Sequence, residues 1–304
     1  MLSAWTLGVA GWSISIVSED ADLRIAPSGV SNRFCVTDVA PDLVLTVRRE
    51  VRRISEDARC TFDSGGVWIS HETATDFWIS LRSALFLSAP YLVARISKNQ
   101  PTGELYVHPN YAQGRTLDPL EYPLDELLFL GLIAKGQGLE VHAAGVDAGP
   151  HGGWLLLGHS GAGKSTASGL LIESGLGEIL SDDRIVLRRR DSKGGSEWWM
   201  FGTPWHGTGA HAVPRGCPLK RIYVLSHAPV TRLGELPRSV FTAEIVARTF
   251  HPLYAPHVLA YTLKSIEHLT QDVPCRTLAF RPDREMPWVL ASDSVPSTQN
   301  ISLG

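Results

Sequence analysis

The 304-residue sequence has few cysteines, and none of them forms a motif. Cys35, Cys60, Cys217 and Cys275 lie far apart, form no C-x-x-C pair and have no paired histidines nearby. This spacing argues against a structural zinc site and against a disulfide framework. We therefore expect reduced thiols in a cytoplasmic protein.

The sequence also lacks a charge excess and a long apolar run. It has 28 Lys and Arg residues against 31 Asp and Glu residues, a net charge of −3. No basic leader precedes an apolar segment, and no segment approaches 18 unbroken apolar residues. We expect no nucleic-acid partner, no membrane association and no signal peptide. With 44% apolar residues, the chain can bury a sizeable core.

One stretch carries a strong chemical signal. Residues 158 to 165 read G-H-S-G-A-G-K-S and fit the pattern G-x-x-x-x-G-K-[ST]. Glycines let successive backbone N–H groups converge on phosphate oxygens, and a helix that opens near Lys164 adds the positive end of its dipole. The preceding run 154–157 is typical of a buried strand, and residues 166–174 are typical of a helix. The expected nucleotide-binding residues are Gly158, His159, Ser160, Gly161, Ala162, Gly163, Lys164, Ser165 and Thr166.

Such a loop implies ATP and Mg²⁺ as ligands, with Lys164 on the outer phosphates and the Ser165 hydroxyl on the metal. Asp182 and Asp183 follow Lys164 by roughly 20 residues, where nucleotide hydrolases and kinases place an acid. We expect both on one strand, residues 178–187, where neighbouring side chains point to opposite faces. At most one can then touch the γ-phosphate. Both stay candidates for the catalytic base and, with Ser165, for the metal site.

Five further residues are candidates on weaker grounds. His142 lies on an expected strand ahead of the loop, and a structural role is about as well supported as a catalytic one. His206 and Trp205 lie in the glycine-rich run 202–209, which suits a loop at the mouth of the site. Arg215 and Lys220 are either charges at the rim of the site or groups that bind phosphate.

Two domains and a tail are expected. Residues 1–118 read as short strands with alternating apolar residues and predict an antiparallel β domain for recognition or packing. Residues 119–291 begin with a helix that ends at Gly136, followed by strands 139–146 and 154–157, which should form a hairpin. Residues 292–304 read as a flexible tail. The fold class is therefore α/β in the second domain and α+β overall.

His142, the loop, and the run Leu180-Ser181-Asp182-Asp183-Arg184-Ile185 together resemble the catalytic domain of HPr kinase, over about residues 120 to 290. That family shares its fold with ATP-using phosphoenolpyruvate carboxykinase. The resemblance implies a mixed, mainly parallel sheet flanked by helices, with the phosphate loop at one strand end. It also implies that the acidic pair includes the base that takes a proton from the acceptor serine.

The chain departs from HPr kinase at His159, where that family has an acidic residue, and at residues 202–207, where it has a Glu-Arg-Gly signature. The second departure resembles the broader HPr kinase-like group, which phosphorylates lasso-peptide precursors and small hydroxylated metabolites. The main hypothesis is thus an ATP- and Mg²⁺-dependent kinase acting on a hydroxyl of a peptide, protein or small molecule. Its catalytic candidates are Asp182, Asp183, His142, Lys164 and His206.

Two other functions stay open. The first is a nucleotide-binding regulatory or assembly module without catalysis, whose β-rich half would bind a partner. The second is carboxykinase-like chemistry, which would need a second metal and a cluster of arginines around the acid, for which only Arg184 and Arg215 are at hand. Self-association of the chain is also left open.

Overall fold

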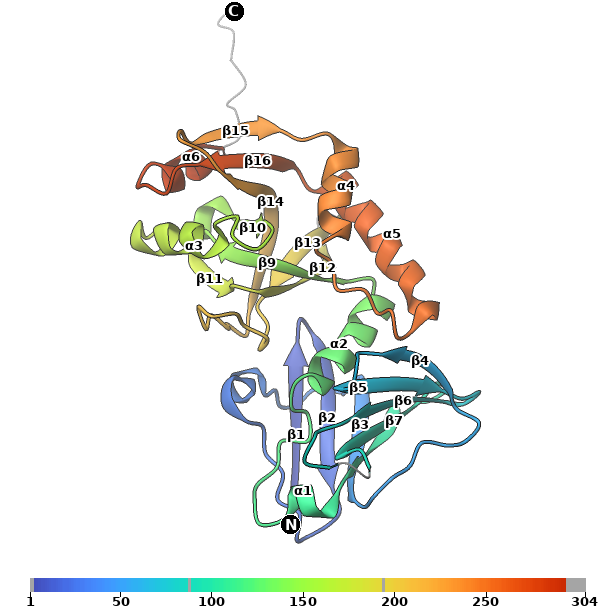
Figure 1. The fold of residues 1–304 in the computed structure, drawn as a ribbon. Helices are drawn as coiled ribbons and strands as arrows, with labels where there is room; N and C mark the ends of the chain where they lie inside the picture. The colour runs from blue at the N-terminus through green and yellow to red at the C-terminus, as the bar shows by residue number, and fades with distance from the viewer. Residues whose placement is uncertain (1–2, 87–88, 193–194, 294–304) are drawn as a thin grey trace, which may run out of the picture. The chain divides into compact units, whose positions relative to one another are not determined.

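The computed structural model describes residues 3–86, 89–192 and 195–293. The chain divides into unit 1, residues 1–136 and 251–260, and unit 2, residues 137–250 and 261–304 (Figure 1). This division differs from the boundary predicted at residue 118, because helix α2 (Leu124–Lys135) belongs to unit 1. Nine of its twelve residues are buried, so α2 packs as a core element of unit 1 and does not open the next domain.

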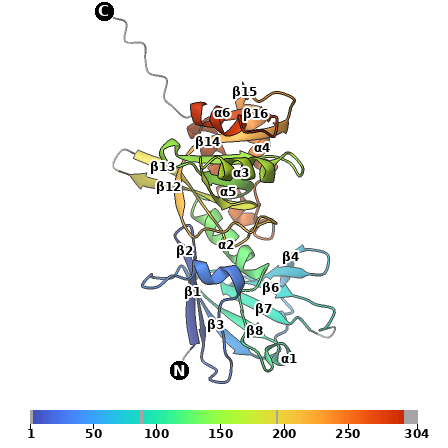
Figure 2. The same ribbon diagram turned by 90° about the vertical axis from the view of Figure 1, so that its left-hand side faces the viewer.

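The β-rich prediction for the first unit is confirmed, but its wholly antiparallel arrangement is wrong. The sheet has the order β1-β2-β3-β8-β7-β6-β5-β4 (Figure 2). Strand β3 runs parallel to both neighbours, β2 and β8, because a long connection containing η1 (Gly29–Phe34) separates β2 from β3. The strands are β1 (Ser3–Val9), β2 (Trp12–Ser18), β3 (Leu43–Arg49), β4 (Arg59–Asp63), β5 (Trp68–Glu72), β6 (Asp76–Leu81), β7 (Leu92–Ser97) and β8 (Thr102–Val107), followed by α1 (Pro109–Ala112).

The sheet of unit 2 has the order β10-β9-β12-β13-β14-β16-β15, with β11 paired to β9 and β10 also paired to β14. The prediction of a mainly parallel sheet is wrong, because most pairs are antiparallel. Only a few residues of sequence separate β9 from β10 and β12 from β13, and so short a connection forces antiparallel pairing. Among the described strands of unit 2, only the pairs β10–β14 and β14–β16 are parallel, and helices lie on the connections between them.

The elements of unit 2 are β9 (Leu139–Asp147), η2 (Gly149–His151), β10 (Gly153–Leu157), α3 (Lys164–Glu173), β11 (Glu178–Ser181), β12 (Arg184–Ser192), β13 (Gly195–Phe201), β14 (Gly216–His227), β15 (Arg232–Glu235), α4 (Arg238–Val246), α5 (Pro256–Asp272), β16 (Cys275–Phe280) and α6 (Met286–Asp293). Helix α5 begins in unit 1. The predicted hairpin of β9 and β10 is confirmed. Of the predicted tail, Ser292 and Asp293 end α6, and the rest lies outside the described residues.

Strand β10 is buried on both faces, as its continuous apolar run predicts. Leu155 and Leu157 pack in one core cluster with residues of α4 and α5. Trp154 and Leu156 point to the other face and pack with residues of α3 and α6. Packing on both faces therefore holds β10 in place, including its last residue, Leu157, after which the loop begins. No helix in the described part of the chain is long and apolar enough to span a membrane.

Candidate phosphate-binding site

The strand and the helix predicted on either side of the glycine-rich loop are both present. Strand β10 ends at Leu157, and α3 begins at Lys164. Gly163 has a φ of 97°, and a Cβ built there would lie 2.7 Å from the ring of Phe280 and 3.0 Å from that of His227. Only glycine fits this close approach and this backbone conformation. The loop residues 159–161 are exposed.

The Lys164 side chain folds back across the mouth of the loop. Its Nζ donates to the Gly158 carbonyl at 2.8 Å and lies 3.1 Å from His142 Nε2. Burial lowers the pKa of Lys164, Asp183 opposes this shift, and Arg248 adds to it. A partly desolvated ammonium group at a loop of backbone amides is suited to bind phosphate oxygens.

His142 connects Lys164 to one of the two acids. Its Nδ1 lies 2.9 Å from Asp183 Oδ1. If the Nδ1 proton is donated to Asp183, Nε2 accepts from Lys164. The hydrogen bond from His142 is the largest cause that lowers the pKa of Asp183; burial opposes it, while Arg184 lowers the pKa further. A carboxylate, an imidazole and an ammonium group thus form one chain beside the loop.

The acidic pair does not lie on a strand, which corrects the prediction of one strand over residues 178–187. Strand β11 ends at Ser181, β12 begins at Arg184, and both pair with β9. The two acids occupy the bend between them, and their side chains have different partners. Asp182 accepts from the backbone N–H groups of Gly207 at 2.9 Å and Gly209 at 2.6 Å. Asp182 therefore holds a loop, and Asp183 faces Lys164 and His142.

The loop held by Asp182 is the glycine-rich run predicted for the mouth of the site. A Cβ built at Gly209 would lie 2.5 Å from Asp182 Oδ2, so the contact requires glycine there. Thr203 Oγ1 donates to the Arg184 carbonyl at 2.8 Å, which ties the start of the loop to β12. Trp205 is buried, and His206 is partly exposed with its Nδ1 2.9 Å from the Gly207 carbonyl. The loop is thus fixed to the acidic bend.

Arg215 and Lys220 lie in ion pairs elsewhere. Arg215 pairs with Asp147 and Glu178, and Lys220 pairs with Glu197. Asp147 lies opposite Gly153, the first residue of β10, whereas the phosphate loop leaves the last. His142 and Asp147 are five residue steps apart along β9, roughly 16 Å at about 3.3 Å per residue. Both cations are engaged at the end of the sheet away from the loop.

The sequence did not predict two residues that lie near the loop, His227 and Arg248. His227 Nε2 lies 2.9 Å from the Gly161 carbonyl, and the Arg248 carbonyl accepts from the His142 backbone N–H at 2.7 Å. His227 could have been found, because it ends β14, which runs parallel to β10 and therefore finishes at the same edge. Arg248 follows α4 in an irregular segment, where no pattern marks it.

The glycine-rich loop and the acidic bend offer few direct protein ligands for a magnesium ion. Ser165 is exposed at the start of α3, whereas the carboxylates of Asp182 and Asp183 already have partners. Among the described residues, no group of three or more His, Cys, Asp and Glu could hold a metal ion. Magnesium in phosphate sites keeps several waters and takes only one or two protein ligands plus phosphate oxygens. The Ser165 hydroxyl, with an acid reached through water, fits that pattern.

No protein-family model matches this chain, and no curated protein matches it. The likeness to HPr kinase therefore rests on the motif residues alone.

Proposed function

We propose that the protein is a cytoplasmic ATP-dependent kinase that transfers the γ-phosphate to a hydroxyl group of a peptide, protein or small molecule. The proposal rests mainly on two side-chain contacts at the glycine-rich loop: Asp183 contacts His142, and His142 contacts Lys164. A passive nucleotide-binding loop needs the lysine and the amides. It does not need a carboxylate held beside the lysine by a histidine.

Each residue has a defined task in this proposal. The loop amides and Lys164 bind the phosphates, and Asp183 accepts the proton of the acceptor hydroxyl as its oxygen attacks the γ-phosphorus. The new oxygen–phosphorus bond forms as the bond to the β–γ bridging oxygen breaks, and ADP leaves. Magnesium, when bound at Ser165, neutralises phosphate charge. Catalysis then rests on positioning and electrostatic stabilisation, so an acid of low pKa suffices as proton acceptor.

His142 is a positioning residue in this scheme. Its hydrogen bond lowers the pKa of Asp183 and fixes the direction of the carboxylate. Asp182 is proposed to act on the acceptor side by holding the loop that carries His206. This assigns different roles to the two acids: Asp183 is the base and Asp182 organises the loop.

A regulatory module without catalysis is the second candidate, because the phosphate loop alone would serve it. Carboxykinase-like chemistry ranks lower, since Arg215 is held by Asp147 and Glu178 at the other end of β9. That leaves Arg184 as the arginine paired with the acid, fewer than a carboxylate substrate with a second metal would require.

The test is phosphoryl transfer from labelled ATP to a pool of hydroxylated metabolites and serine peptides. Wild-type protein should give a labelled product, and Asp183→Asn should lower its yield by about 100-fold or more. Asp191→Asn is the matched control, because Asp191 is exposed on β12, and its carboxylate accepts from the nearby Ser196 hydroxyl. ATP binding without transfer to any acceptor would favour the regulatory module. Full activity of Asp183→Asn would remove Asp183 as the base.

A further inference from the structure

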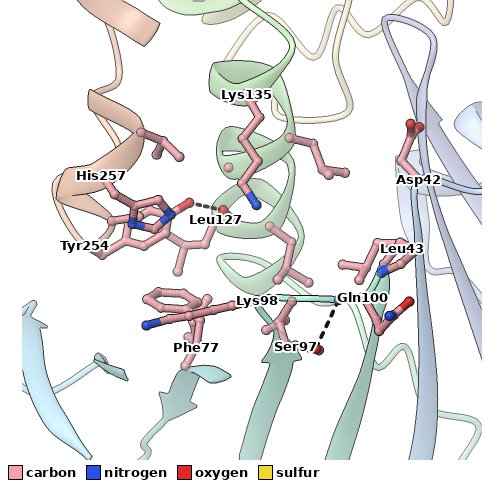
Figure 3. Close-up of a pocket in the computed structure, with 18 of the residues that line it drawn as sticks. Asp42, Leu43, Phe77, Ser97, Lys98, Gln100, Leu127, Lys135, Tyr254 and His257 are labelled. Carbon is pink, nitrogen blue, oxygen red and sulfur yellow. Dashed lines mark hydrogen bonds between the residues drawn. The ribbon is translucent and has the colours of Figure 1, made fainter. Parts of the chain in front are cut away.

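We propose that unit 1 contains a binding site for a small amphipathic anion, a molecule with an apolar body and one anionic group. The site is a pocket of about 330 Å³, and every residue that lines it belongs to unit 1. Figure 3 shows it between the sheet and α2, with the start of α5 on one side. Pockets of this size hold metabolite-sized ligands. The proposal does not depend on the kinase activity.

The walls of the pocket are mainly apolar. Leu128 and Leu132 of α2 and Phe77 and Ile79 of β6 line it. The rings of Tyr254 and Phe77 lie 5.4 Å apart, and the Tyr254 hydroxyl donates to a backbone carbonyl of α2. That hydrogen bond fixes the ring as part of the wall (Figure 3). The walls therefore suit an aliphatic or aromatic body.

A glycine in the middle of α2 keeps the pocket open. Beyond the backbone of α2 itself, the nearest heavy atom to a Cβ built at Gly131 is the Tyr254 hydroxyl oxygen, at 3.6 Å. Space for a side chain is therefore available, although glycine is unfavourable inside a helix compared with alanine. Replacing Gly131 with a larger residue would fill the volume from a rigid element.

The charged groups at the pocket favour an anion. Lys98, Lys135 and His257 line it, with Asp42 as the acidic residue in the lining. Asp42 accepts from the Ser13 backbone N–H at 2.8 Å, and Lys98 donates to Glu72 and to a backbone carbonyl.

Lys135 is the cation available to a ligand. Within the described ranges, its Nζ has neither a hydrogen-bond partner nor a carboxylate partner. Burial lowers the pKa of His257, and the positive charge of Lys135 lowers it further. Figure 3 shows the Lys135 side chain running along α2 toward the middle of the pocket. An anionic group would meet this ammonium while its apolar body lies against Leu128 and Phe77.

The test uses anilinonaphthalene sulfonate as the fluorescent probe, since it is itself an amphipathic anion. Titration of the full chain should give one saturable site. Gly131→Leu should lower the affinity by more than roughly tenfold, because the leucine occupies the pocket. Lys135→Gln should lower it by roughly fivefold, and Lys264→Gln, an exposed lysine outside the pocket, should leave it unchanged.

Competition then tests the charge of the ligand. Octanoate should displace the probe at least about tenfold better than octylammonium, and Lys135→Glu should reverse that order. Equal displacement by both, or a probe signal that is the same in wild-type protein and Gly131→Leu, would overturn the proposal. Because Lys135 is exposed on the surface, its variants decide the question even if Gly131→Leu does not fold.

Discussion

The glycine-rich loop of unit 2 and the pocket of unit 1 are built in different ways. The loop site draws its backbone from eight consecutive residues, 158–165, and adds His142 and Asp183 by pairing of β9 with β12. The pocket draws its lining from separate segments of β3, β6, β7, α2 and α5. A short sequence motif is therefore enough to predict the loop site. The pocket forms only when distant segments come together in the folded chain.

The two sites also differ in how their cations are balanced. Lys164 lies within reach of His142 and is compensated by the negative charge of Asp183. At the pocket, Lys135 and Lys98 both act on His257, and the first of them lacks an acidic partner within the described part of the chain. In our proposals, the loop site reacts with a bound anion, whereas the pocket only binds one.

The largest expected effect is a loss of ATP affinity that involves the loop site and not the pocket. Lys164→Ala should weaken ATP binding by about 100-fold or more, because the ammonium group is the main cation at the loop. Calorimetric titration with ATP and Mg²⁺ measures it. The affinity of unit 1 for anilinonaphthalene sulfonate should not change in this variant. Lys220→Ala, which removes an exposed ion pair with Glu197, is the control, and an equal loss of ATP affinity there would break the comparison.

His142→Ala should lower phosphoryl transfer by roughly 10- to 100-fold. It removes the hydrogen bond that contributes most to the low pKa of Asp183, so that pKa should rise. Transfer needs ionised Asp183 and is lost as the pH falls through its pKa. The acid limb of the pH–rate profile should therefore move to higher pH in the variant. A slower variant with an unmoved acid limb would show that His142 acts in another way.

His206→Ala should affect phosphoryl transfer and not ATP binding, because Asp182 holds the loop that carries His206. We expect phosphoryl transfer to fall by at least roughly tenfold, about 1.4 kcal/mol, with little change in ATP affinity. Steady-state kinetics with calorimetry separates the two quantities. If ATP affinity falls instead, the loop 202–209 belongs to the nucleotide site.

The smallest expected effect is on stability. Burial lowers the folded-state pKa of Lys164, so the folded protein without ligand binds fewer protons than the unfolded chain between that pKa and about 10.4. The stability of the folded protein should rise with pH in that window. Below the window, the buried ammonium group of Lys164 destabilises the folded state by its full amount. Lys164→Met should therefore melt no lower than wild type at pH 7, and its advantage should shrink as the pH rises. A lower melting temperature at pH 7 would contradict this.

The parts that sequence predicted are those fixed by local pattern. The apolar run 154–157 predicted a doubly buried strand, and the glycines predicted the loop that follows it. His142 was expected near the loop through the hairpin, and it lies 3.1 Å from Lys164 Nζ. These features depend on residues close in sequence or joined by one turn.

The parts that sequence did not predict depend on pairing between distant segments. The direction of the strands, and hence the mainly antiparallel sheet, follows from which connections are turns and which contain helices. The bend at Asp182 and Asp183 exists because β11 and β12 both pair with β9. The ion pair of Arg215 with Asp147 joins residues 68 apart, and the segment 251–260 joins unit 1 from far along the chain.

The most direct measurement is a crystal structure with Mg²⁺ and a non-hydrolysable ATP analogue. The account predicts that Lys164 Nζ leaves the Gly158 carbonyl and His142 for the outer phosphates, that the amides of residues 159–164 surround them, and that Asp183 faces the open side of the γ-phosphate. Nucleotide bound elsewhere, or bound here with Lys164 still on Gly158 and Asp183 turned away from the γ-phosphate, would contradict it.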